Sequence, residues 1–200
     1  MTFFTCGMDK HPQTGWDRIR LACHAREDGG AALSELVFTP EIGSNLLGFG
    51  VGGIDYLCDV ALHARGNPIL GTPVLYPTPD RVRNATFTFD GRTFNFEPNA
   101  GAEFVHGLVR HERWDYDAPV VTAEGISATT RIVFEPGKPY YDRFPIRNTL
   151  ELTYTLCESG MRFDFTVYNQ DPSQRLPFGL GIHPYFRIHG PRESVRIQVP

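Results

Sequence analysis

The protein is a chain of 200 residues in which 23 Asp and Glu outnumber 19 Lys and Arg, for a formal net charge of −4 at pH 7. This mildly acidic balance argues against a nucleic-acid-binding protein, which would carry a basic face, and offers no polybasic segment to an anionic membrane. With 41% hydrophobic and 21% charged residues, the composition is typical of one globular domain, which we place over residues 1–200. No apolar run approaches the roughly 18 residues of a membrane helix, and no secretory signal is visible.

Alternating apolar and polar residues begin early in the chain. In 17–23, Ile19 and Leu21 share a face opposite Arg18 and Arg20, the pattern of a half-buried β-strand. Further strands are predicted at 33–38, 44–51 and 53–59.

The four cysteines lie at wide, irregular spacings: Cys6, Cys23, Cys58 and Cys157. None forms a Cys-x-x-Cys pair, so neither a zinc ribbon nor a thioredoxin-like redox site is predicted. Because no secretory signal precedes them, we expect reduced thiols in a cytoplasmic protein.

The segment 71–84 contains three prolines followed directly by Asp80 and Arg81. The prolines hold the chain extended and remove backbone donors. Such a stiff loop can aim the forked guanidinium of Arg81 at ligand oxygens. The alternative is a surface loop with solvated charges.

The clearest local signal is the hairpin 86–96, TFTFDGRTFNF. Asp90-Gly91 is a favoured two-residue type I′ turn, because both central positions need a positive φ. With these two residues as the loop, Phe87 faces Phe94. One side of the hairpin is then apolar, as a sheet that covers a core requires, and it carries Phe87, Phe89, Phe94 and Phe96.

Two histidine-bearing segments follow the pattern of functional loops. His106 precedes a glycine in 103–114, and His183 stands between a Gly-rich stretch and Pro184 in 177–187. A glycine allows close approach of backbone or ligand, and a following proline stiffens the backbone of His183. Each histidine is either a ligand contact or proton donor, or a structural residue with a backbone partner.

The last third of the chain continues the strand pattern. A second hairpin is predicted from 149–156 and 161–168, and a strand pair from 120–123 and 127–134, with a final strand at 193–199. No segment shows a sustained 3.6-residue apolar stripe. Many short alternating strands predict an all-β sandwich or barrel.

Several chemical templates are absent. No GxSxG elbow and no phosphate-binding GxxxxGK[ST] loop occurs, and the glycines of 48–53 precede no helix pattern. His63, His106, His111 and His183 lack HxH or HxxxH spacing, so no metal site is predicted.

In combination these segments resemble the aldose 1-epimerase (galactose mutarotase) family, in order along almost the whole chain. The resemblance rests on SELVFTPEIGSNLLGFGVGGIDYL, on the Pro-rich loop that leads into TFTFDGRTFNF, on His106-Gly107 before Trp114, and on HPYF at 183–186. It implies a large antiparallel β-sandwich, the galactose mutarotase-like supersandwich. It also implies interconversion of the α and β anomers of a free hexose, by proton transfers that need no cofactor.

The resemblance also implies roles for particular residues. His183 would be the general acid at the ring oxygen, His106 would hydrogen-bond the sugar near that oxygen, and Arg81 would hold sugar hydroxyls. Asp80 stands where the family commonly has Asn, and Asp accepts hydrogen bonds but cannot donate them when ionised.

The catalytic glutamate of the family lies in its C-terminal third, and this chain ends before that position. Glu97, Glu103 and Glu112 are outside the family's motif, so no base is assigned. Since family members are longer by roughly half, we expect these residues to be the first two-thirds of a longer protein, so that the sandwich lacks its C-terminal part.

Three alternatives remain. A hexose 6-phosphate as substrate would need extra cations near the pocket, for which Arg83 and Arg110 are candidates. A non-catalytic sugar-binding sandwich would keep Arg81, His106 and aromatic platforms without the acid–base pair. A cupin-like metal site is the third. The partner expected in the first two is a small-molecule sugar, and no oligomeric state is predicted.

Overall fold

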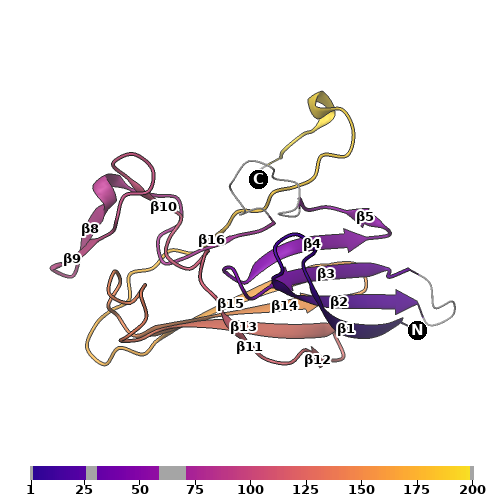
Figure 1. The fold of residues 1–200 in the computed structure, drawn as a ribbon, viewed down its shortest axis with the longest axis horizontal. Coiled ribbons are helices and arrows are strands. Elements are labelled where there is room, and N and C mark those ends of the chain that lie inside the picture. The colour runs from indigo at the N-terminus through magenta and orange to yellow at the C-terminus, as the bar shows by residue number, and fades with distance from the viewer. Residues whose placement is uncertain (1, 26–30, 59–70, 199–200) are drawn as a thin grey trace.

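The computed structural model describes residues 2–25, 31–58 and 71–198, and its regular structure is almost entirely β (Figure 1). The first sheet is antiparallel and follows chain order: β1 (Thr2–Lys10), β2 (Asp17–Ala25), β3 (Ser34–Thr39), β4 (Asn45–Val51) and β5 (Ile54–Asp55). The second contains β11 (Asp115–Tyr116), β12 (Val120–Val121), β13 (Ile126–Phe134), β14 (Asn148–Leu156) and β15 (Met161–Asn169). Within the described residues, no helix is long and apolar enough to span a bilayer.

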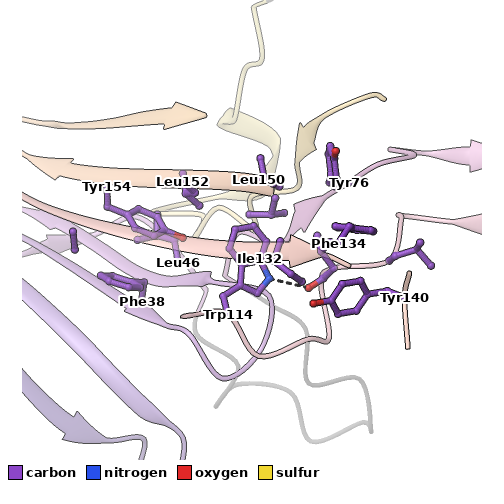
Figure 2. Close-up of a cluster of buried hydrophobic side chains, with 14 of the residues drawn as sticks. Phe38, Leu46, Tyr76, Trp114, Ile132, Phe134, Tyr140, Leu150, Leu152 and Tyr154 are labelled. Atoms are coloured by element: carbon purple, nitrogen blue, oxygen red, sulfur yellow. Dashed lines mark hydrogen bonds between the residues drawn. The ribbon is translucent and has the colours of Figure 1, made fainter. Parts of the chain in front are cut away.

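The two sheets pack face to face and enclose the core (Figure 2). Phe38 of β3 stacks on Tyr154 of β14 with ring centroids 4.5 Å apart. The hydroxyl groups of Ser44 and Thr130 form a buried hydrogen bond of 2.8 Å across the layers. Burial of each large apolar side chain here contributes about 1.5–3 kcal/mol to folding. The predicted antiparallel sandwich is therefore confirmed.

Three short strand pairs lie beside the sandwich: β6 (Val74–Leu75) with β16 (Gly181–Ile182), β7 (Arg81–Val82) with β10 (Phe104–Val105), and β8 (Thr86–Phe89) with β9 (Arg92–Asn95). Two short 3₁₀ turns complete the described elements, η2 (Arg83–Ala85) and η3 (Arg192–Ser194). In Figure 1 the β8–β9 hairpin stands apart from the sheets at one end of the molecule.

Both predicted hairpins are confirmed, the first with its predicted register. Phe87 pairs with Phe94, and Asp90 and Gly91 have φ values of 51° and 74° as a type I′ turn requires. Leu156 pairs with Met161 in the second hairpin. The predicted pairing around Gly125 joins β12 to β13.

The final strand predicted at 193–199 is wrong over its described residues, and residue 199 lies outside them. η3 covers its start, and residues 195–198 after it form no strand. Val195 and Ile197 are accordingly exposed, at 43% and 88%. Alternation alone does not make a strand where no neighbour supplies hydrogen bonds.

Two other differences arise at the edges of the first sheet. β1 was not predicted, because it lies at the sheet edge and most of its residues are exposed. The strand predicted at 53–59 is reduced to β5 and a single bridge from Leu57 to Phe186, and residue 59 lies outside the described residues.

Candidate functional site

The Pro-rich segment holds both histidine loops by backbone hydrogen bonds. The carbonyl of Pro73 accepts from the N–H of His183 at 3.0 Å, and the carbonyl of Asp80 accepts from the N–H of His106 at 2.9 Å. Between them, the carbonyl of Tyr76 accepts from Leu108 at 2.7 Å. One rigid segment therefore sets the relative position of two loops that are distant in sequence.

Gly107 is required for this approach. Its φ is +70°, and a Cβ atom built on it would lie 2.3 Å from the carbonyl oxygen of Tyr76. No real Cβ contact is so short, and L-residues avoid this backbone conformation. The glycine after His106 thus allows the loop to pack on the Pro-rich segment.

The two predicted histidines are brought together. The ring centroids of His106 and His183 are 5.4 Å apart, with the rings nearly perpendicular. His183 also stacks on Tyr185, with ring centroids 4.9 Å apart. Tyr185 in turn packs with Trp16 against Leu47, so an aromatic wall from two distant segments supports His183.

The ring nitrogens of the pair divide into buried and accessible atoms. Nδ1 of His106 and Nδ1 of His183 are buried without a hydrogen-bond partner. The Nε2 atoms of the two rings are not fully buried. Neither has a hydrogen-bond partner among the described residues. The Nε2 atoms are therefore the ones that a ligand can meet.

The pKa of His106 lies below its ordinary value of 6.5, first because burial disfavours the charged ring. The positive charges of Arg110 and His183 lower it further, and Asp80 opposes them. The neutral form of His106 is therefore favoured near pH 7.

The other two predicted contacts, Asp80 and Arg81, lie beside His106. Arg81 pairs with Val105 in the β7–β10 ladder, which places it one residue from His106. Its side chain is 60% exposed and forms an ion pair of 3.2 Å with Glu103. Since such exposed pairs contribute about 0–1 kcal/mol, Arg81 can exchange Glu103 for a ligand at little cost.

An open groove of about 660 Å³ adjoins Arg81. It is lined mainly by the Pro-rich segment, the β8 strand and the segment around Phe178, with Pro77, Thr78, Pro79, Arg83, Phe87, Pro177 and Gly179 among its residues. Its lining includes Arg81 but neither His106 nor His183, so the groove lies next to the histidine pair and does not enclose it.

The remaining candidates do not join the pair. His111 is exposed, and His63 lies outside the described residues. Among the residues that the structure does describe, no three His, Cys, Asp or Glu are placed to hold a metal ion. No local sequence pattern marks Trp16, because only the fold brings the β1–β2 loop and Tyr185 together on Leu47.

Comparison with known proteins gives one family model over most of the chain. The model described as aldose 1-epimerase matches residues 35–199. The uncharacterized protein YihR of Escherichia coli K12 is 27% identical over 115 residues, a match that covers 56% of this chain and 34% of that protein.

Solved structures share the fold at low sequence identity. A galactose mutarotase-like protein from Clostridium acetobutylicum has a TM-score of 0.76 and 20% identity, over 92% of this chain and 54% of that one. Galactose 1-epimerase from Lactobacillus acidophilus has a TM-score of 0.58 and 15% identity, over 84% and 48%. The chain thus has a galactose mutarotase-like fold and spans about half the length of these structures.

Proposed function

Since this chain belongs to the aldose 1-epimerase family, we propose that the protein interconverts the α and β anomers of a hexose. The proposal applies to the whole protein, because the matched structures are about twice as long as the part that this chain covers. The shared fold of galactose 1-epimerase from Lactobacillus acidophilus supports it.

The proposed reaction moves two protons. A base takes the proton of the C1 hydroxyl while Nε2 of His183 gives a proton to the ring oxygen, and the bond between C1 and the ring oxygen breaks. The open aldehyde turns about its C1–C2 bond, and the reverse transfers close the ring on the other face. The base in this proposal is a carboxylate that is not among the residues assigned here.

The observation that carries this proposal is the histidine pair. His106 and His183 lie edge to face, 5.4 Å between centroids, and both present Nε2 while Nδ1 is covered. Tyr185 stacks on His183 and so restricts the plane of its ring. A general acid held in one orientation fits proton transfer to a single ring oxygen.

His106, Arg81 and Asp80 have binding roles in the proposal. The lowered pKa of His106 favours a neutral ring, which can hydrogen-bond a sugar oxygen without adding a second positive charge beside His183. Arg81 donates to sugar hydroxyls, and Asp80 accepts from them.

The four cysteines are unpaired in the structure. Burial raises the pKa of the Cys23 thiol, so this residue is an unreactive part of the core. Free thiols support the reducing cytoplasm as the compartment that we propose.

Anomer exchange tests the function directly. With protein made from its complete gene, polarimetry of freshly dissolved α-D-galactose and α-D-glucose should show faster mutarotation. His183→Ala should lose at least about 100-fold, because one positioned acid contributes about 10²–10⁴ in rate. His24→Ala is the matched control, since His24 bonds Thr5 at the far edge of the first sheet.

Two outcomes would count against the proposal. If the wild-type protein leaves exchange at the uncatalysed rate, it is not an epimerase for these sugars, and sugar binding without exchange would indicate a binding module. If His183→Ala and His24→Ala behave alike, His183 is not the acid.

A further inference from the structure

The Pro-rich segment is attached to both sheets of the sandwich at buried asparagines. The N–H of Thr72 donates to the side-chain carbonyl of Asn45, the first residue of β4, at 2.8 Å. The hydroxyl of Tyr76 donates to the side-chain carbonyl of Asn148, the first residue of β14, at 2.7 Å. Both asparagines are fully buried. The segment that holds the histidine loops is thus fixed to the first sheet at Thr72 and to the second sheet at Tyr76.

Tyr76 is the residue of this segment at which the two histidine loops meet. Its carbonyl accepts from the N–H of Leu108, in the loop of His106, at 2.7 Å. The residue before it pairs with Gly181 in the β6–β16 ladder, and β16 leads directly into His183. A shift of Tyr76 therefore changes the positions of both histidines.

The hydroxyl bond gives the Tyr76 side chain one orientation. The side chain is fully buried, and its ring meets the ring of Phe134 edge to face, with centroids 5.7 Å apart (Figure 2). The amide N–H of Asn148 donates to the carbonyl of Ile146 at 2.8 Å, which turns the amide oxygen toward Tyr76. Hydrogen bonds are directional, whereas apolar contacts are not. The pair therefore defines the place of the Pro-rich segment on the second sheet more closely than packing alone.

Tyr154 of β14 carries a comparable bond at another place in the sandwich. It is also fully buried, and its hydroxyl lies 3.2 Å from the hydroxyl of Ser44 in the turn before β4. Its ring stacks on Phe38 of β3. This bond joins one sheet to the other, while the bond of Tyr76 joins a sheet to the site. Both contribute to stability, so a measurement at the site separates positioning from stability.

We propose that Tyr76 is a positioning residue, and that its hydrogen bond to Asn148 sets the relative placement of His106 and His183. The inference rests on the proposed epimerase function, in which His183 meets the ring oxygen of a hexose that His106 binds. A misplacement of about 1 Å can cost about 100-fold in rate. Because Tyr76 is fully buried, it acts through the two loops and not by contact with the sugar.

Tyr76→Phe in the complete protein tests the inference, because it removes the hydroxyl and keeps the ring. By exchange NMR, kcat/KM for anomer exchange of glucose or galactose should fall by about 10- to 100-fold. Tyr154→Phe is the matched control and should leave kcat/KM within about twofold, since its bond lies outside the histidine loops. Both variants should lower the melting temperature by similar amounts, because each loses one buried hydrogen bond.

Asn148→Ala shows whether the pair acts as a unit. Added to Tyr76→Phe, it should lower kcat/KM little further, because the bond to Tyr76 is already lost and effects within one pair are not additive. A further loss as large as that of Asn148→Ala alone would overturn the role of their bond. Equal activity losses in Tyr76→Phe and Tyr154→Phe, or no loss in either, would overturn the positioning role and leave the epimerase function intact.

If the wild-type protein exchanges neither sugar, the epimerase function fails for them, and the histidine rings themselves decide the inference. The ¹H–¹⁵N signals of the His106 and His183 rings should still shift in Tyr76→Phe and stay in place in Tyr154→Phe. Signals that shift equally in both variants, or in neither, would overturn the positioning role.

Discussion

The sandwich interior and the histidine site treat buried polar atoms in opposite ways. In the interior, the hydroxyl of Tyr76 donates to Asn148 at 2.7 Å, and Ser44 bonds Thr130. The buried side-chain polar atoms without a partner, among the described residues, are those of Thr78, His106 and His183. All three belong to the loops of the site. An unpaired buried polar atom costs about 1–3 kcal/mol of stability. Its presence in these loops calls for an explanation, and a bound ligand that supplies the missing hydrogen bond is one.

The backbone also differs between the regular ladders and the loops of the site, although a positive φ at a non-glycine residue occurs outside the site too, for example at Ser44. In β13, β14 and β15 the described residues follow regular ladders. In the site, Asp80 and His106 have positive φ values of 55° and 70° although neither is a glycine. Each such residue costs about 1–3 kcal/mol and persists only where surrounding contacts hold it. The free energy gained by packing the sheets offsets the strain in these loops, which would not adopt this arrangement alone.

The largest expected change in the free energy of unfolding comes from a substitution at Gly107, where the loop packs on the Pro-rich segment. Gly107→Ala should destabilise the protein by about 4 kcal/mol, because it adds a clash with Tyr76 to a positive φ. Gly91→Ala is matched in φ, at +74°, but a Cβ there meets nothing within 4 Å, so its cost should be about 1–2 kcal/mol. Urea unfolding measures both. Equal losses would show that the close approach to Tyr76 does not matter.

The next effect tests the sandwich. Leu152→Ala should cost about 3 kcal/mol, since Leu152 is fully buried between the sheets. Ile197→Ala removes a residue that is 88% exposed and should change stability by less than about 0.5 kcal/mol. If the two variants unfold at the same urea concentration, the described core does not dominate stability.

A smaller effect tests the electrostatics of the site. Because the folded protein lowers the pKa of His106, the unfolded chain binds that proton more tightly. The free energy of unfolding should therefore rise with pH between the lowered pKa and 6.5, and fall on acidification through that window. His106→Asn removes this contribution and still tolerates the positive φ. The stability difference between wild type and variant should then depend on pH in the window, and a constant difference would contradict the lowered pKa.

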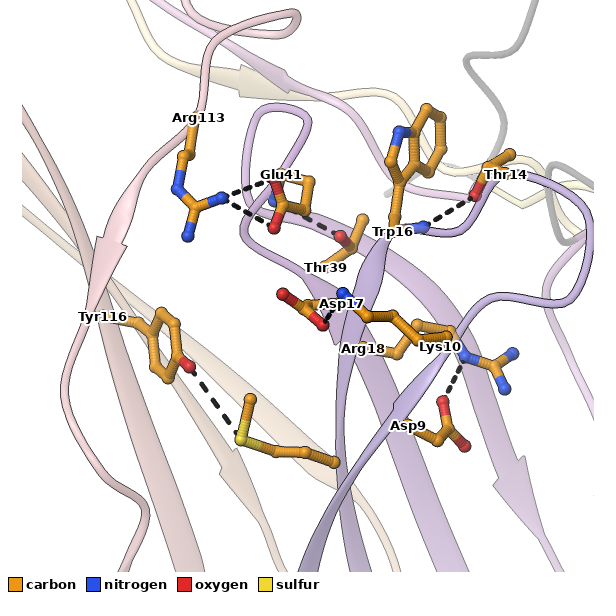
Figure 3. Close-up of polar contacts among 11 residues, drawn as sticks. Asp9, Lys10, Thr14, Trp16, Asp17, Arg18, Thr39, Glu41, Arg113 and Tyr116 are labelled. Atoms are coloured by element: carbon orange, nitrogen blue, oxygen red, sulfur yellow. Dashed lines mark hydrogen bonds and ion pairs between the residues drawn. The ribbon is translucent and has the colours of Figure 1, made fainter.

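The smallest effect concerns the outer face of the first sheet. Arg18 donates to Asp9 at 2.6 Å across the β1–β2 pair (Figure 3). Arg18→Gln should cost about 0.5 kcal/mol at low salt and less at 1 M salt, because ions screen partly exposed pairs. A loss of stability as large as that of Leu152→Ala would show that this ion pair stabilises the protein as much as a buried apolar side chain does.

Local sequence was sufficient for the two main hairpins, one in the sandwich and one beside it. The Asp90-Gly91 turn and the alternating apolar residues of β14 and β15 specify their hairpins, because strand period and turn type are properties of neighbouring residues. The same alternation led to a wrong strand at 193–199, where pairing would have needed a partner from elsewhere in the chain. β1 was missed for the converse reason, since its partner β2 rather than its own pattern makes it a strand.

The sequence marked His106, His183, Arg81 and Asp80 as candidates, and their family resemblance supplied roles that remain predictions. Their meeting was decided by tertiary structure: the carbonyls of Pro73, Tyr76 and Asp80 bind two loops that no local pattern connects. Which nitrogen of each ring is covered also depends on neighbours distant in the chain. Residue type sets the chemistry that is available, and burial, which arises only from packing, decides where that chemistry can be used.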